Sequence, residues 1–183
     1  MIWNPWRGCH RYSEGCKHCY LHKGDYKRNI DTNLITKSDD YDKPIRKNKS
    51  GKYVMKANSL VYVCFSSDFL LAEADIWRDE CYMMMKERQD LSFLFLTKRI
   101  QRFMVSLPDD WHDGYDNVIV GVSVENQKNA DLRLQYFKNL PIKHKNIICQ
   151  PLLENINLEP YLEGIELVVV GGESDYYGRV LNY

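Results

Sequence analysis

Five short apolar runs without polar alternation constrain the fold of this chain more than any other feature of its sequence. They fall near residues 60–65, 91–96, 118–122, 146–150 and 166–170. A strand that is buried on both faces, as in a parallel sheet, is apolar throughout, whereas a half-buried strand alternates. Apolar residues at helical spacing separate the runs, over residues 74–84, 100–107 and 126–137, with a shorter piece at 158–162. We therefore predict parallel strands at the runs, with helices between them.

Polar or glycine-rich residues follow each run at the point where the strand would end. The carboxyl ends of parallel strands meet at one edge, and that edge holds the active site in folds of this class. A further short strand over residues 1–4 would bring the N-terminal loop to the same edge. The pattern predicts an α/β fold, a partial (β/α)6 TIM-like barrel in one domain of 183 residues. The residues expected at its mouth are Ser66, Asp68, Lys98, Arg99, Ser123, Glu125, Asn126, Gln150, Gly171, Gly172 and Glu173.

The N-terminal loop carries half of the chain's six cysteines within eleven residues. Cys9, Cys16 and Cys19 have the spacing C-x6-C-x2-C. Clustered thiolates are the ligands of zinc and of iron–sulfur centres. Gly8 and Gly15 precede the first two cysteines, where a tight loop needs a residue that tolerates positive φ. The spacing therefore predicts a metal centre on this loop.

The cysteine count leaves two kinds of metal centre open. A structural zinc site has four protein ligands, and His22, His10 or His18 could complete a Cys3His set. A 4Fe-4S cluster on three thiolates instead leaves one iron open to another ligand. A disulfide is disfavoured, because three local cysteines leave one thiol unpaired. The spacing alone favours neither metal centre over the other.

Composition narrows the class of protein. The formal net charge is zero, so no general field attracts nucleic acid, although a local basic patch still can. The sequence shows neither a leader peptide nor a run of about 18 apolar residues. We therefore expect a cytoplasmic protein without a membrane segment, in which thiols stay reduced. Cys64, Cys81 and Cys149 lie in apolar surroundings and are expected in the core.

A polar segment over residues 30–59 interrupts the regular pattern. Six basic residues and no acidic residue lie from Lys43 to Lys56. The sequence Asn48-Lys49-Ser50-Gly51 indicates a turn between two short extended pieces, which makes this segment a candidate hairpin insertion. A basic hairpin could bind a phosphate backbone, whereas most charge runs are solvated surface. Both interpretations stay open.

Several motifs, in order, resemble a known family. The opening Trp3-Asn4-Pro5, Gly8-Cys9, Gly15-Cys16 and Cys19-Tyr20 is similar to the three-cysteine-motif phage proteins, a domain family of unknown function. The later motifs that agree are Leu96-Thr97-Lys98-Arg99, Gly121-Val122-Ser123-Val124-Glu125-Asn126, Arg133, Pro151-Leu152-Leu153 and Val170-Gly171-Gly172-Glu173-Ser174. The family in turn resembles radical S-adenosylmethionine (SAM) enzymes, which have a partial barrel and a three-cysteine loop after the first strand.

Two departures from the radical SAM pattern stand out. Those enzymes usually have C-x3-C-x2-C, whereas the first spacer here has six residues. Their Gly-Gly-Glu element often follows the second strand, whereas Gly171-Gly172-Glu173 follows the last apolar run. The chain also stops soon after that run, so the resemblance implies a form truncated at its C-terminus.

The resemblance implies roles for the residues at the mouth. A 4Fe-4S cluster on Cys9, Cys16 and Cys19 would bind SAM and would require an electron donor. The residues expected to contact the cofactor are Ser66, Asp68, Ser123, Asn126, Gln150, Gly171 and Gly172, and the candidate catalytic residues are Lys98, Arg99, Glu125 and Glu173. Lys98 and Arg99 would grip an anionic substrate. The alternative is that they form structural ion pairs with Glu125, Glu154 or Glu173.

Three classes of function remain open. The first is a radical SAM-like enzyme of phage or prophage type, whose substrate is unknown and could be a nucleic acid. The second is a zinc-binding module that recognises nucleic acid or a partner protein without radical chemistry. The third is a cluster-binding barrel that serves as a redox or scaffold subunit. Metal analysis separates the second from the others, and SAM binding separates the first from the third.

Overall fold

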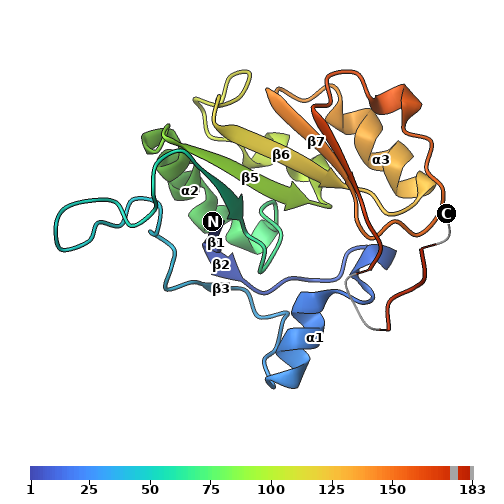
Figure 1. Ribbon diagram of the computed structural model, residues 1–183, viewed down its shortest axis with the longest axis horizontal. Coiled ribbons are helices and arrows are strands. Elements are labelled where there is room, and N and C mark those ends of the chain that lie inside the picture. The colour runs from blue at the N-terminus through green and yellow to red at the C-terminus, as the bar shows by residue number, and fades with distance from the viewer. Residues whose placement is uncertain (174–176, 182–183) are drawn as a thin grey trace.

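A computed structural model of the protein describes residues 1–173 and 177–181 (Figure 1). Within these residues, six strands form one sheet in the order β1-β4-β5-β6-β7-β8. All neighbouring strands of this sheet run parallel, as the apolar runs predicted. The strands are β1 (Ile2–Trp3), β4 (Ser59–Val63), β5 (Leu91–Thr97), β6 (Val118–Ser123), β7 (His144–Cys149) and β8 (Leu167–Val170).

Burial explains why the central strands lack alternation. Nearly every residue of β5, β6 and β7 is buried or partly buried, because both faces of these strands are covered. Strand β4 differs from the expectation, since it alternates exposed Leu60 and Tyr62 with buried Val61 and Val63. One face of β4 is therefore open, and the edge strand β8 exposes Leu167 at its start.

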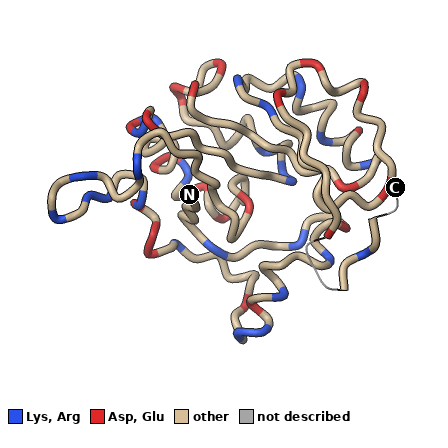
Figure 2. Tube along the Cα trace, in the orientation of Figure 1, with Lys and Arg blue, Asp and Glu red and all other residues tan. Residues whose placement is uncertain are grey.

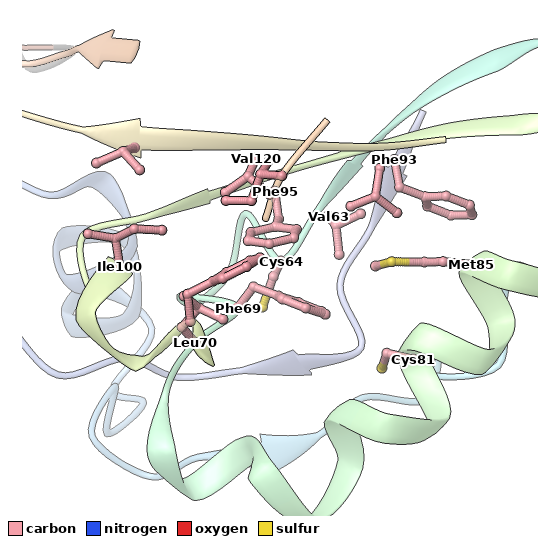
Figure 3. Close-up of a cluster of buried hydrophobic side chains, with 14 of the residues drawn as sticks. Val63, Cys64, Phe69, Leu70, Cys81, Met85, Phe93, Phe95, Ile100 and Val120 are labelled. Carbon is pink, nitrogen blue, oxygen red and sulfur yellow. The ribbon is translucent and has the colours of Figure 1, made fainter. Parts of the chain in front are cut away.

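Three α-helices accompany the sheet in the described part of the chain: α1 (Tyr20–Lys27), α2 (Asp75–Glu87) and α3 (Gln127–Phe137). Helix α2 lies along one face of the sheet, and its Met85 points toward Val63 and Phe93 (Figure 3). Asn126 caps the N-terminus of helix α3 as predicted, because its side chain accepts a hydrogen bond from the Asn129 amide at 2.9 Å. Both helices thus connect neighbouring parallel strands.

The helix predicted over residues 100–107 is wrong. The segment forms two 3-10 turns, Ile100–Arg102 and Met104–Ser106. The buried positions Ile100, Phe103 and Ser106 recur every three residues, which suits a helix with three residues per turn better than an α-helix. A 3-10 turn, Glu159–Tyr161, also replaces the helical piece expected at residues 158–162.

The polar segment forms an excursion from the body of the molecule. Strand β2 (Trp6–Arg7) pairs antiparallel with β3 (Thr36–Lys37) at its base. Further along, Lys47 and Tyr53 form an antiparallel bridge around a turn with positive φ at Gly51. The hairpin reaches away from the sheet (Figure 1) and carries several of the basic positions (Figure 2). The predicted turn between two extended pieces is confirmed.

A layer of aromatic rings fills the space beside the sheet. Trp6 stacks on Phe69 with ring centroids 5.4 Å apart, and Phe69 stacks on Phe95 at 4.5 Å. The three cysteines that were expected in the core, Cys64, Cys81 and Cys149, are buried in it. Figure 3 shows the first two. In the described residues, no helix combines the length and the apolar character needed to span a bilayer.

Candidate functional site

A cavity of about 370 Å³ opens where the strands of the parallel sheet end. Its walls come from the C-terminal ends of β5, β6 and β7, from the segments that follow β4, β5, β7 and β8, and from the N-terminal loop. Parallel strands place their carboxyl ends together, which is why these distant segments meet. The residues of chemical interest in its lining are Cys9, Cys16, Cys19, Asp68, Lys98, Arg99, Ser123, Gln150, Gly172 and Glu173.

Four residues of the predicted set are not among the described residues that line this cavity: Ser66, Glu125, Asn126 and Gly171. The Ser66 hydroxyl donates to the Trp6 carbonyl at 2.8 Å. Glu125 is buried beneath the cysteine loop, and Asn126 caps α3. The Gly171 amide continues the sheet ladder by donating to the Cys149 carbonyl. These side chains and this amide therefore hold the backbone around the site in place.

The loop reaches Cys9 through a close backbone contact. Gly8 has φ +93°, and a Cβ at this position would overlap the Leu34 carbonyl. The Cys9 amide donates to the Thr32 carbonyl at 2.7 Å, while the Gly8 amide donates to the Ser66 carbonyl at 3.1 Å. Cys9 is thus fixed between the segment after β4 and the segment before β3.

Gly15 is needed for close packing, and the expectation of positive φ there is wrong. The structure gives Gly15 no positive φ. Its amide lies 3.4 Å from the Glu125 carboxylate, and an added Cβ would lie 3.2 Å from the carboxyl carbon. Glu125 is in turn held by Arg133 at 2.7 Å, and both side chains are 1% exposed. The loop before Cys16 therefore rests on a buried ion pair.

A second ion pair holds the loop after Cys9. Arg99 lies 3.0 Å from Asp68 and donates to the His10 carbonyl at 2.8 Å. The Thr97 hydroxyl also donates to Asp68 at 2.7 Å. Arg99 therefore forms a structural ion pair, which is one of the two roles predicted for it. Its partner is Asp68, so the prediction of Glu125, Glu154 or Glu173 as the partner is wrong.

Each expected partner of Arg99 has another contact. Glu125 pairs with Arg133 and Glu173 with Arg179, while Glu154 accepts from the Gln127 amide. Asp68 lies next to Arg99 because the ends of β4 and β5 are adjacent in the sheet.

Tyr12 explains how the six-residue spacer is accommodated. The guanidinium carbon of Arg99 lies 4.8 Å from the centre of the Tyr12 ring, and that of Arg133 lies 5.6 Å from it. Cation–π contacts of this kind are attractive. The spacer is therefore bound to the strand ends through the His10 carbonyl, the Tyr12 ring and the Gly15 amide.

The three loop cysteines are free thiols, partly buried at the rim of the cavity. Burial raises the pKa of the Cys9 thiol to about 12, and the charge of Asp68 adds to this effect while Arg99 opposes it. Metal binding at Cys9 would therefore release a proton. The Tyr12 amide donates to the Cys16 sulfur at 3.5 Å, and amide hydrogen bonds to ligand sulfurs tune iron–sulfur centres.

The donor set at this rim is three thiols with two nearby imidazoles. His18 and His22 line the cavity, whereas His10 binds Glu73 at 2.6 Å. Burial and then the charge of Arg11 lower the pKa of His22, which keeps it neutral and able to act as a ligand. In the described residues, no three His, Cys, Asp or Glu side chains are grouped as they would be around one ion. The three loop thiols line one cavity, but they are not gathered around one point as the ligands of a bound ion would be.

The sequence did not predict the contacts that two residues make at this site. Arg133 lies on the inner face of α3 with Ala130, Leu134 and Phe137. A lone charge on an apolar helix face is a signal that could have revealed a buried ion pair. Tyr12 carries no such signal, because its contacts come from two segments far away in the chain.

A comparison with family models finds one match over almost the whole chain. The model described as "Protein of unknown function (DUF5131)" matches residues 1–182. Neither the search of curated proteins nor the search of solved structures found a match. The match confirms the prediction that the chain belongs to a domain family of unknown function.

Proposed function

The chain belongs to the DUF5131 family, and we propose that it is an iron–sulfur-binding, radical SAM-like protein of phage or prophage type. Cys9, Cys16 and Cys19 would hold a 4Fe-4S cluster at the mouth of a partial (β/α)6 barrel. The observation that carries the proposal is that three free thiols line one cavity at the carboxyl edge of a parallel sheet. The motifs shared with the three-cysteine-motif phage proteins support the same assignment.

When bound, such a cluster would supply an open iron for the amino and carboxylate groups of SAM and the electron that cleaves SAM. The chain's own residues would bind and orient the cofactor. Ser123 and Gln150 line the cavity, and both have side chains that can form hydrogen bonds. Gly172 lines the cavity and would allow close approach of the cofactor to the backbone, because it has no side chain.

Ion pairs engage three of the four candidate catalytic residues: Arg99 with Asp68, Glu125 with Arg133, and Glu173 with Arg179. Arg99 and Glu125 are buried against partners and hold the loop, so we assign them as positioning residues. Lys98 and Glu173 line the cavity. In this proposal Lys98 faces an anionic part of the substrate, and Glu173 is oriented by Arg179. A cytoplasmic location and a separate electron donor belong to the same proposal.

A zinc-binding interaction module is the second candidate. It is favoured by His18 and His22, which line the same cavity as the cysteines. A closed Cys3His site would bring one of them to the sulfurs. Such a module would bind nucleic acid or a partner protein.

Anaerobic reconstitution followed by SAM titration tests the radical SAM proposal. We expect about four iron and four sulfide per chain and a change in the visible spectrum when SAM is added. S-adenosylhomocysteine lacks the transferable methyl group and serves as a matched ligand for comparison. A cluster that forms but does not respond to SAM would contradict the SAM assignment and would leave a redox or scaffold role.

A further inference from the structure

A second hollow of about 570 Å³ adjoins the cavity that holds the thiols. The two share His18, Cys19 and His22 in their linings. Helix α1 and the loop before it form one side of this second hollow, which we call the basic groove after Arg11, Lys17 and Lys23 in its lining. Basic positions gather in this region in Figure 2. A ligand in the groove would therefore lie next to Cys19.

The lining of the basic groove has an excess of positive charge. Arg11, Lys17 and Lys23 line it, and Asp31 is the carboxylate among its described lining residues. Arg11 donates to the Cys16 carbonyl through Nε at 3.3 Å, which uses one of the five N–H donors of its guanidinium. Asp31 is engaged locally, because it accepts from the Asn33 amide at 2.9 Å. Arg11 and Lys17 thus offer donors that suit an anion, and Lys23 adds its positive charge.

Aromatic rings stand beside these cations. Tyr26 and Tyr177 line the groove and are 86% and 75% exposed. The Lys23 ammonium lies 5.4 Å from the centre of the Tyr177 ring. Exposed rings next to cations are the combination on which nucleic-acid bases stack while their phosphates are neutralised.

We propose that the basic groove binds a nucleotide unit, with its phosphate on Arg11, Lys17 and Lys23 and its base against the exposed tyrosines. Arginine binds phosphate oxygens as a planar fork, and lysine binds them as a point charge. The net charge of the whole chain is zero, so this local excess supplies the attraction. Phosphate binding is independent of the cluster, whereas the further role as substrate anchor beside Cys19 rests on the proposed function.

Calorimetry on the full chain tests the groove with adenosine monophosphate, adenosine and a single-stranded oligodeoxynucleotide. We expect adenosine to bind about tenfold or more weakly than its monophosphate, because it lacks the charged group. The double variant Lys17→Ala/Lys23→Ala should weaken binding of the monophosphate by about tenfold or more. The matched control Lys128→Ala/Lys138→Ala removes the same charge at exposed positions in α3 and at its end and should bind as the wild type does.

The oligodeoxynucleotide identifies the source of the phosphate. The ligand is assigned as a nucleic acid if the oligodeoxynucleotide binds more tightly than the monophosphate. The slope of the logarithm of its binding constant against the logarithm of the salt concentration should then fall by about one for each phosphate contact that a variant removes. Equal binding assigns a free nucleotide. Equal binding of adenosine and its monophosphate would overturn the proposal, as would full binding by the double variant or the absence of binding by both phosphate probes. Iron and sulfide counts on the same samples report separately on the cluster.

Discussion

The guanidinium of Arg99 lies 3.0 Å from the carboxylate of Asp68 and also donates to the His10 carbonyl at 2.8 Å. The two side chains are only 9% and 7% exposed. His10 directly follows Cys9, the first candidate metal ligand. One buried ion pair therefore links the ends of β4 and β5 to the loop that carries the thiols.

Replacing one member of this pair should be costly. We expect Asp68→Asn to lower the free energy of unfolding by about 3 kcal/mol, because it leaves the buried Arg99 charge without compensation. Urea denaturation measures the loss. The matched control is Asp116→Asn, since Asp116 is 82% exposed and pairs with Lys143 at 2.8 Å. That change should cost much less, because solvent screens an exposed pair, and equal losses in the two variants would refute the structural role of Asp68.

Two glycine-to-alanine changes should have opposite signs. At Gly15 an added Cβ would lie 3.2 Å from the Glu125 carboxyl carbon, which the buried pair with Arg133 holds in place. We expect Gly15→Ala to lower the free energy of unfolding by about 1–2 kcal/mol. At Gly24, within α1, the nearest atom is the flexible end of Arg28 at 3.5 Å.

The second change should therefore be favourable. Gly24→Ala should raise the free energy of unfolding by up to about 1 kcal/mol, through helix propensity. Chemical denaturation of the two variants side by side gives both signs. A stabilising Gly15→Ala would show that Glu125 moves freely and would remove our explanation for this glycine.

Acid should unfold the protein partly through Asp25. Burial alone would raise the pKa of Asp25, but hydrogen bonds from Arg28 and Thr32 and the charge of Arg7 outweigh it and hold the pKa below its usual value. A lowered pKa means that the stabilisation is present above the unfolded-state pKa of about 4 and is lost as the pH falls through the folded-state pKa. Asp25 is fully buried and joins α1 to β2, so its protonation should weaken that contact.

The dependence is measured as the free energy of unfolding between about pH 5 and pH 2. Asp25→Asn should lower stability at neutral pH and flatten the curve in this window. Asp79→Asn removes an exposed carboxylate from α2 and should leave the curve close to that of the wild type. A wild-type slope in the Asp25 variant would show that other carboxylates control acid unfolding.

The sequence predicted those parts of the fold that depend on local pattern. Burial on both faces makes β5 and β6 continuously apolar, and an asparagine cap marks the start of α3. The 3-10 turns after β5 were wrongly predicted as an α-helix. The interval between Ile100 and Phe103 is three residues, which fits a 3-10 helix as well as an α-helix. Intervals between apolar residues do not separate these two cases when the segment is short.

The partners of the charged residues could not be predicted in the same way. The carboxyl-edge rule brought Asp68, Arg99 and Glu125 to one end of the sheet, but it does not decide which acid faces which base. That choice depends on register between neighbouring strands and on the inward turn of Arg133. The identity of the metal also lies beyond the pattern, because thiolates at this spacing suit zinc and iron alike.

The central claim is that Cys9, Cys16 and Cys19 together hold an iron–sulfur cluster, and the most direct test is iron and sulfide counting on anaerobically reconstituted protein. Cysteine-to-alanine variants at each of the three positions are compared with Cys81→Ala, which removes a buried thiol of α2. We predict about four iron and four sulfide in the wild type and in Cys81→Ala, and loss of both elements and of the brown chromophore in each loop variant. One zinc per chain without iron or sulfide, or a chromophore that survives Cys16→Ala, would contradict the account.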